Sequence, residues 1–248
     1  MLTGQELLET ICAELQEIGM KQMAGKLKVM YRSDDFLTMD HLTLLADLIE
    51  PEYNEKITKR VKTRLKNANL LGCPYELGDC ANSNEREYFP AGITESLSSL
   101  NFVEEGLNVC ILGPSDSGKT YLAKALGVKA CQDYRVAYCH CESLIEDLAY
   151  LKTDDFKKYR TQMKHLVKLD MLILDDFLLH TISEEREVKV LQDILEFRLQ
   201  SERSTIFCSQ REPKSWVSMI LNDEISFNAI LKRATKHYTI VINTKETE

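Results

Sequence analysis

The feature that most constrains the fold of this 248-residue chain is the stretch GPSDSGKT at residues 113–120. It fits the pattern G-x-x-x-x-G-K-[S/T] and stands between the apolar run LNVCIL and the helical segment YLAKALGVKAC, the context in which that pattern forms a phosphate-binding loop. Backbone N–H groups of such a loop, with the positive end of the next helix dipole, bind phosphates. The sequence therefore predicts a strand, a loop and a helix here, with a nucleotide at the loop.

Two side chains at the end of this loop have separate predicted roles. Lys119 is expected to reach the β- and γ-phosphates, and the Thr120 hydroxyl is expected to ligate Mg²⁺. Asp116 adds a negative charge to a loop that receives a polyanion. We expect its side chain to point outward, because Asp tolerates unusual backbone angles. The predicted nucleotide contacts are Gly113, Pro114, Ser115, Asp116, Ser117, Gly118, Lys119, Thr120 and Tyr121.

The second half of the site is predicted at LDMLILDD, an apolar strand that ends in two acids. Asp175 would hold Mg²⁺ through water, and Asp176 would polarise the water that attacks ATP. Two such carboxylates could also belong to a plain acidic loop. Their combination with Lys119 and Thr120 favours the catalytic interpretation.

Five short apolar runs with helical segments between them dominate the chain from residue 101. They are LNVCIL, RVAYCHC, LDMLILDD, STIFCSQ and HYTIVI. This alternation predicts an α/β fold, with a mostly parallel sheet covered by helices on both faces. Along the chain, RVAYCHC stands between the phosphate loop and the acidic strand. That insertion is typical of the additional-strand ATPases, which include AAA+ and RecA-like proteins, and is generally lacking in phosphate-loop kinases of small molecules.

Three polar residues near the last two strands are further candidates. Ser209 and Gln210 close STIFCSQ, and a polar side chain there would lie next to the γ-phosphate and sense hydrolysis. Arg233, just before the last strand, is the candidate for an arginine that a neighbouring subunit supplies against transition-state charge. A plain surface charge beside Lys232 and Lys236 explains Arg233 equally well.

The first part of the chain has a different pattern. Residues 1–70 are predicted to be all-helical, with apolar residues at helical spacing and with Pro51 expected to break or kink the third helix. Residues 71–100 are rich in Gly, Pro, Asn and Ser and are predicted to be an extended connection. The predicted domains are therefore a helical domain at 1–70, a linker at 71–100 and an ATPase domain at 101–248.

A basic segment, KITKRVKTRLK at residues 56–66, ends the helical part. Ile57, Val61 and Leu65 form an apolar stripe that should anchor this helix to the small helical domain. The remaining positions could be a solvated surface. Because the whole chain has a net charge of -8, so many cations in one segment favour an anionic partner. The predicted contacts with this partner, which the family resemblance described below implies to be DNA, are Lys59, Arg60, Lys62, Arg64 and Lys66.

Composition excludes several other classes of protein. No apolar run approaches the roughly 20 residues that span a bilayer, so we expect no membrane partner. The N-terminus is acidic and amphipathic, unlike a signal peptide, and we expect a cytoplasmic location. Of the eight cysteines, Cys110 and Cys208 fall in apolar strand-like runs and are interpreted as small hydrophobic residues. Neither Cys73 with Cys80 nor Cys139-His140-Cys141 has the paired CxxC spacing of zinc sites, which speaks against a metal site.

The chain resembles the IstB family, the ATP-dependent helpers of insertion-sequence transposases, which are related to DnaC helicase loaders. The resemblance covers nearly the whole chain, from GMKQMAGKL and RVKTRLKNANL through the phosphate loop and DMLILDDF to RSTIFCSQREPKSW and the tail LNDEISFNAILKRATKHYTIVI. Two positions depart from the family pattern, since Asp116 replaces the usual Gly and Lys232 the usual Asp. The most distinctive matching residues are Pro213, Trp216, Asp223, Ala229, Ile230, Leu231, Arg233 and His237.

The resemblance implies an AAA+ core that assembles as a homo-oligomer through nucleotide-bridged interfaces and remodels double-stranded DNA for a transposase. The sequence ends soon after the last predicted strand, so we expect no C-terminal helical lid. Three alternatives remain: a DnaC-like loader of a replicative helicase, a small-molecule kinase with a phosphate loop, and a nucleotide-gated scaffold without turnover. The inserted strand, the paired acids and the basic helix speak against the kinase.

Overall fold

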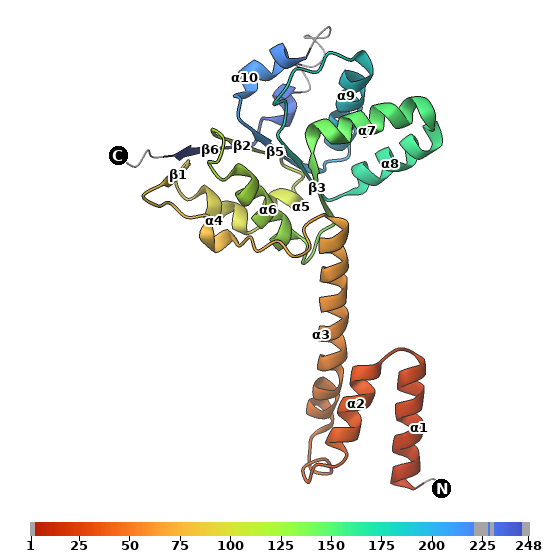
Figure 1. Cartoon of the computed structure of the whole chain (residues 1–248). Helices are drawn as coiled ribbons and strands as arrows, with labels where there is room; N and C mark the ends of the chain where they lie inside the picture. Colours follow the sequence, from red (N-terminus) through yellow and green to blue (C-terminus); the bar gives the residue numbers. More distant parts are fainter. Residues whose placement is uncertain (1–2, 221–227, 229–230, 245–248) are drawn as a thin grey trace. The chain divides into compact units, whose positions relative to one another are not determined.

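The computed structural model describes residues 3–220, 228 and 231–244 (Figure 1). The chain divides into two compact units, Met1–Thr63 and Arg64–Glu248. No helix in the described part is long and apolar enough to cross a membrane.

The first unit is helical, as the sequence predicts. Its helices are α1 (Gly4–Glu17), α2 (Lys21–Met30) and the start of α3 (His41–Asn67). Thr3 begins α1 with a capping box, because its hydroxyl accepts the Glu6 N–H while the Glu6 carboxylate accepts the Thr3 N–H, which satisfies two amides that have no partner in the helix. Buried side chains of the three helices form one small core, made of Leu8, Cys12, Ala24, Leu27 and Leu48.

Pro51 does not break α3, so the prediction of a helix end at this residue was wrong. The proline removes one N–H donor from the helix, but helical structure continues to Asn67. The next residue, Glu52, is buried, and its carboxylate accepts the backbone N–H groups of Gln22 (2.9 Å) and Met23 (3.4 Å) at the start of α2. These charge-assisted bonds attach the middle of α3 to α2 and stabilise the helix where proline weakens it.

The second unit is built on one six-stranded sheet in the order β1-β6-β2-β5-β4-β3. All neighbouring strands are parallel except β1 and β6, which are antiparallel. The strand inserted between β2 and β4 is β5, and not RVAYCHC as the sequence analysis expected, because β3 lies at the edge of the sheet. The strands are β1 (Arg86–Phe89), β2 (Val109–Leu112), β3 (Val136–His140), β4 (Met171–Asp175), β5 (Ser204–Ser209) and β6 (Tyr238–Thr244).

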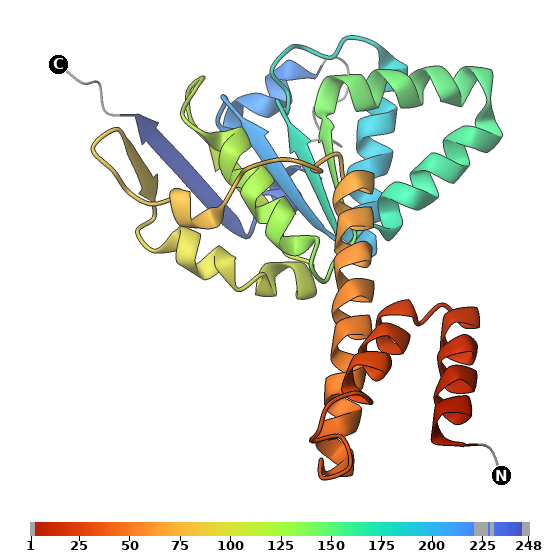
Figure 2. The ribbon, with the colours of Figure 1, turned by 60° about the horizontal axis from the view of Figure 1, so that its bottom comes forward.

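Helices cover both faces of this sheet (Figure 2). Alternate residues of each strand enter two separate cores, so that Ile111 packs on one face and Leu112 on the other. The Ile111 face is covered by α4 (Ile93–Ser98), α5 (Asn101–Glu104) and α6 (Lys119–Ala130), and the Leu112 face by α7 (Cys141–Asp154), α8 (Phe156–Lys168), α9 (Glu185–Gln200) and α10 (Pro213–Trp216). The fold class is the predicted one, a parallel sheet wound by helices on both sides.

Residues 71–100 are more than a connection, because the second unit begins at Arg64 and includes them. They contain the short 3-10 helix η1 (Leu77–Asp79), the strand β1 and the helix α4. Tyr88 and Leu97 are buried in the same core as Ile111. A strand of four residues among turn-forming residues gives too short an alternation to be seen in the sequence, and its pairing with β6 is non-local.

Candidate nucleotide-binding site

The phosphate loop connects β2 to α6, as predicted. At its start, a Cβ atom on Gly113 would lie 2.6 Å from the carbonyl oxygen of Ile242 and 2.7 Å from Ser117 Oγ, so a side chain has no space there. At its end, Gly118 has a φ of +97° and leads directly into α6, a backbone conformation that glycine adopts without strain. The loop is therefore fixed at both ends by glycine.

Lys119 is the first residue of α6 and is only 6% exposed. Its Nζ donates a hydrogen bond to the carbonyl oxygen of Pro114 across the loop, at 2.5 Å. Burial lowers the pKa of Lys119, and the nearby carboxylates of Asp175 and Asp176 oppose that shift. The side chain thus holds a cation inside the loop, at the position where the β- and γ-phosphates are expected.

Thr120 and Asp175 meet at the predicted metal position. Thr120 Oγ1 donates to Asp175 Oδ2 at 2.8 Å, and Asp175 is only 2% exposed. Hydroxyl and carboxylate oxygens are the ligands that Mg²⁺ prefers. In the loop itself, Ser117 Oγ is buried and has no hydrogen-bond partner among the described residues. A buried hydroxyl rarely lacks a partner, and a phosphate oxygen would supply one, so these residues fit a magnesium nucleotide.

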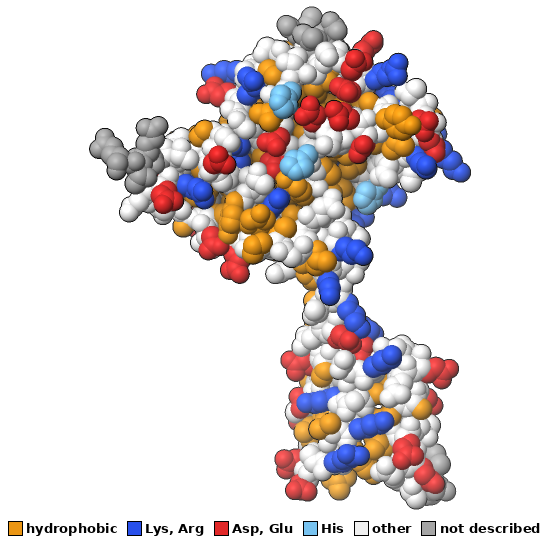
Figure 3. All heavy atoms as spheres, viewed as in Figure 1, with side chains coloured by type: hydrophobic (Ala, Val, Ile, Leu, Met, Phe, Trp, Pro, Cys, Tyr) orange, Lys and Arg blue, Asp and Glu red, His pale blue; other side chains and the backbone are white. Residues whose placement is uncertain are grey.

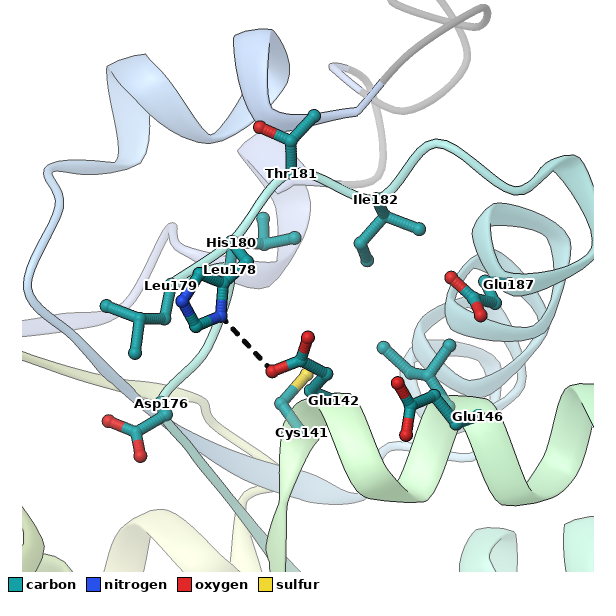
Figure 4. A pocket seen from close by; sticks show the side chains of 11 residues that line it. Cys141, Glu142, Glu146, Asp176, Leu178, Leu179, His180, Thr181, Ile182 and Glu187 are labelled. Atoms are coloured by element: carbon teal, nitrogen blue, oxygen red, sulfur yellow. Dashed lines mark hydrogen bonds and ion pairs between the residues drawn. The ribbon is translucent and has the colours of Figure 1, made fainter.

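Asp176 follows the buried strand but remains accessible. Its side chain is 44% exposed, its φ is +52°, and one carboxylate oxygen lies 3.7 Å from His140 Nδ1 at the end of β3. Asp176 borders a small cavity of about 40 Å³. Within it, Nδ1 of His180 lies 3.2 Å from a carboxylate oxygen of Glu142, the interaction that the dashed line in Figure 4 marks. In the described part of the chain, no group of three or more His, Cys, Asp or Glu side chains could hold a metal ion. The half-exposed Asp176 carboxylate is accessible to water.

Ser209 does not lie free at the sheet edge as a sensor would. It is 1% exposed, and its hydroxyl donates to the carbonyl oxygen of Phe177 at 2.8 Å. The same oxygen accepts the Trp216 indole N–H (3.1 Å) and the Arg211 backbone N–H (3.2 Å). These three bonds use the full capacity of a hydroxyl, so Ser209 fixes the chain after β4 and β5. Gln210 is exposed and stays the predicted sensor.

The loop residue Asp116 is exposed and has a φ of +59°, in agreement with the outward orientation that we expect. Its backbone carbonyl lies 3.5 Å from the Arg86 guanidinium, which comes from β1. Tyr121, the last predicted contact, donates its hydroxyl to Asp79 and packs edge-on against Tyr75. The segment before β2 therefore borders the site, which the sequence did not indicate.

Only part of the distinctive C-terminal set can be placed, since Asp223, Ala229 and Ile230 lie outside the described residues. Trp216 is fully buried against the rings of Phe177 and Phe207. These contacts give Trp216 a structural role. Pro213 begins α10, Leu231 is buried, and His237 accepts the backbone N–H of Asn108.

Arg233 lies on an exposed position of the helical stretch 231–234, beside the exposed Lys232. Its action on the nucleotide of a neighbouring subunit stays a prediction.

The basic segment is more varied than its composition indicates. Arg64 is half-buried, and its guanidinium donates to the carbonyl oxygens of Cys131 and Gln132 after α6. Leu65 packs against the core of the second unit, whereas the sequence assigned it to the helical domain. Figure 3 shows Lys and Arg side chains following one another along α3. The exposed members of the set are Lys59, Arg60, Lys62 and Lys66.

The sequence also missed Tyr138, on β3. Its hydroxyl donates to Asp175 Oδ2 at 2.6 Å, on the same oxygen that Thr120 contacts. Within RVAYCHC the tyrosine looks like one apolar residue of a buried strand. Only the register of β3 beside β4 brings it to the acid.

A phosphate loop, a buried carboxylate bonded to its threonine and this order of parallel strands define a phosphate-loop protein with the AAA+ fold. The family model of IstB-like ATP binding proteins matches residues 13–247. The chain belongs to this family.

Curated relatives agree with this assignment. A putative insertion sequence ATP-binding protein of Sinorhizobium fredii is 32% identical over 220 residues, which cover 88% of this chain and 86% of the relative. The putative ATP-binding protein of insertion sequence IS232 from Bacillus thuringiensis is 26% identical over 242 residues, covering 94% and 91%.

Solved structures show the same fold. The chain matches the structure of DnaI with a TM-score of 0.54 and 21% identity, over 68% of this chain and 88% of DnaI. It also matches the replication initiator DnaA bound to AMPPCP and single-stranded DNA, with a TM-score of 0.55 and 19% identity over 70% of this chain. The chain spans 51% of that initiator's length.

Proposed function

We propose that this chain hydrolyses ATP with Mg²⁺ and uses the energy to act on double-stranded DNA as the helper of an insertion-sequence transposase. The observation that carries the proposal is the bond of 2.8 Å between Thr120 and Asp175. This bond brings the hydroxyl of the phosphate loop to the acid of β4. Lys119 directly precedes Thr120 in the chain, and Asp176 directly follows Asp175. A nucleotide-gated scaffold without turnover would not need a second carboxylate, Asp176, next to Asp175.

Each residue of the site has a distinct chemical task in this proposal. Lys119 and the loop N–H groups hold the β- and γ-phosphates, and Thr120 and Asp175 hold the metal ion. The bound ion neutralises charge that develops on the transferred phosphoryl group. Asp176 orients water and accepts its proton. Gln210 senses the γ-phosphate.

Assembly and DNA binding complete the proposal. We infer a homo-oligomer in which Arg233 of one subunit reaches the nucleotide of the next, since phosphoryl transfer gains much from an arginine supplied in trans. Lys59, Lys62 and Lys66 fall at i, i+3 and i+7 of α3, so one helix face presents three cations to DNA phosphates. The names of the relatives connect them with insertion sequences, which supports a transposase as the protein that this chain assists. We place this activity in the cytoplasm, where ATP and DNA are both present.

The proposal is tested by ATP turnover of the purified chain with and without duplex DNA. Lys119→Ala is expected to abolish nucleotide binding and turnover, while Asp176→Asn keeps binding and lowers turnover at least about a hundredfold, the upper part of the range for general-base catalysis. Lys129→Ala is the matched control, because Lys129 is an exposed lysine on the last turn of the same helix. Absence of Mg²⁺-dependent turnover in the wild type, with and without DNA, would leave only a nucleotide-gated scaffold.

The client is tested by a separate experiment. Tagged Asp176→Asn protein, loaded with ATP, is mixed in turn with the protein encoded directly upstream of its gene, where we expect a transposase, and with the host's replicative helicase. Stable capture of the transposase supports the proposal. Capture of the helicase instead would assign the chain to helicase loading.

A further inference from the structure

Two hydroxyl groups converge on one oxygen atom of Asp175. Thr120 Oγ1 lies 2.8 Å from Oδ2, and the Tyr138 hydroxyl lies 2.6 Å from the same atom. The other oxygen, Oδ1, accepts the backbone N–H of Asp176 at 3.1 Å. Thr120 is the residue that we assign to the metal ion, so its hydroxyl would ligate the ion. The Tyr138 hydroxyl has no such second task.

Tyr138 is itself held firmly. Its side chain is buried, and the Lys124 ammonium group lies 4.4 Å from the centre of its ring. Its backbone N–H donates to the carbonyl oxygen of Ala68 at 3.0 Å, and its own carbonyl accepts the Asn69 side-chain amide at 3.4 Å. Ala68 and Asn69 follow α3 directly, and Asn69 has a φ of +58° in the turn that ends the helix. The phenol therefore approaches Asp175 from a fixed position.

We propose that Tyr138 is a positioning residue that holds the carboxylate of Asp175 in the orientation required for the metal ion. The inference rests on the proposed function, since it concerns the same site. The terminal torsion of an Asp side chain has a broad energy minimum, so the carboxylate plane needs external contacts to fix it. A hydrogen bond from a neutral donor to a buried carboxylate supplies such a contact and stabilises its charged form.

The ring of Tyr138 also belongs to the core on the α6 face of the sheet. If Tyr138 had only this packing role, removing its hydroxyl would leave the response to Mg²⁺ unchanged. Tyr138→Phe keeps the ring, its packing and its contact with Lys124, and removes only the hydroxyl. A matched control is Tyr134→Phe, which removes the hydroxyl that bonds to Glu104 at 2.8 Å, away from Asp175.

The experiment measures binding of a fluorescent ATP analogue to the full chain, first in EDTA and then during titration with Mg²⁺. In EDTA, the affinity of Tyr138→Phe for the analogue is expected to lie within about twofold of the wild type. In the titration, the variant should need about tenfold more Mg²⁺ to reach half of the metal-dependent gain in affinity. This factor corresponds to the loss of one hydrogen bond to a charged group. Tyr134→Phe is expected to match the wild type in both measurements.

Two results would overturn the inference, and they are distinguishable. If Tyr138→Phe is folded and responds to Mg²⁺ as the wild type does, Asp175 needs no hydroxyl from Tyr138, and the proposed function is untouched. If Mg²⁺ does not strengthen binding to the wild type itself, the proposed metal site fails, and the inference fails with it. A thermal melt of both variants shows that the fold is retained.

Discussion

Changing Lys59, Lys62 and Lys66 together to Ala is expected to flatten the salt dependence of DNA binding. All three side chains are exposed, and their spacing puts them on one face of α3. Lys59 forms an ion pair with Glu55 at 2.8 Å, but exposed pairs of this kind contribute less than about 1 kcal/mol and leave the cation available to DNA. Arg64 is excluded from the set, because its guanidinium is bonded to the backbone after α6.

The magnitude follows from the release of counterions. Each phosphate neutralised on duplex DNA contributes about 0.9 to the slope of log affinity against log salt. Three lost contacts therefore reduce the slope by about 2.7. Between about 50 and 200 mM salt, the affinity of the variant should change roughly 40-fold less than that of the wild type.

Fluorescence anisotropy of a labelled duplex, titrated at several salt concentrations, measures this slope. Lys129→Ala is the control, since Lys129 is an exposed lysine of α6 outside the basic segment, and we expect a slope change below about 0.5 for it. The reasoning is refuted if the triple variant keeps the wild-type slope. The lysines would then be a solvated face, and the exposed cations of α8, Lys157, Lys158, Arg160 and Lys164, would be the next surface to test.

Two further predictions concern the nucleotide. Asp116→Gly is expected to bind ATP several-fold more tightly, because it removes a carboxylate whose repulsion of the phosphates is on the order of 1 kcal/mol at contact distance in water. Equilibrium binding measures this effect, and unchanged affinity would mean that the outward side chain is fully screened. Arg233→Ala and Lys119→Ala, each inactive alone, are expected to recover part of the ATPase activity when mixed, because a hybrid interface joins an intact loop to an intact arginine. A mixture that co-assembles without activity would place Arg233 in a structural role or in its own subunit's site.

The sequence predicted the elements that depend on local pattern. Glycines and a lysine at fixed spacing predicted the loop at 113–120. Short apolar runs predicted the strands β2 to β6, and the acids at the end of one run predicted the pair Asp175 and Asp176. Such features need only neighbours along the chain. The roles assigned to Lys119 and Thr120 remain predictions, but the structure brings Thr120 to Asp175 as those roles require.

Contacts between distant parts of the chain could not be predicted in the same way. Ser209 looks like an exposed polar residue at a strand end, yet Phe177 and Trp216 bury it and use its hydroxyl. Arg64 looks like one more surface cation, yet it bonds to carbonyl groups 67 and 68 positions away. In both cases the polar or charged side chain is visible in the sequence, but its hydrogen-bond partners are not. These partners come from distant parts of the chain and are brought close only by tertiary packing.

The turn at the end of α3 connects the two proposals physically. Lys66 belongs to the last turn of that helix, and Ala68 and Asn69 beyond it are bonded to the backbone of Tyr138, whose hydroxyl reaches Asp175. These bonds are possible because β3 is an edge strand, whose free side has unpaired backbone groups. If Lys66 holds DNA and Asp175 holds the metal ion, as we propose, bound DNA would bias that carboxylate without touching the nucleotide. The size of this bias is limited to the difference in DNA affinity between two arrangements of the turn. If DNA changes the affinity for the magnesium nucleotide by some factor, the nucleotide must change the affinity for DNA by that same factor.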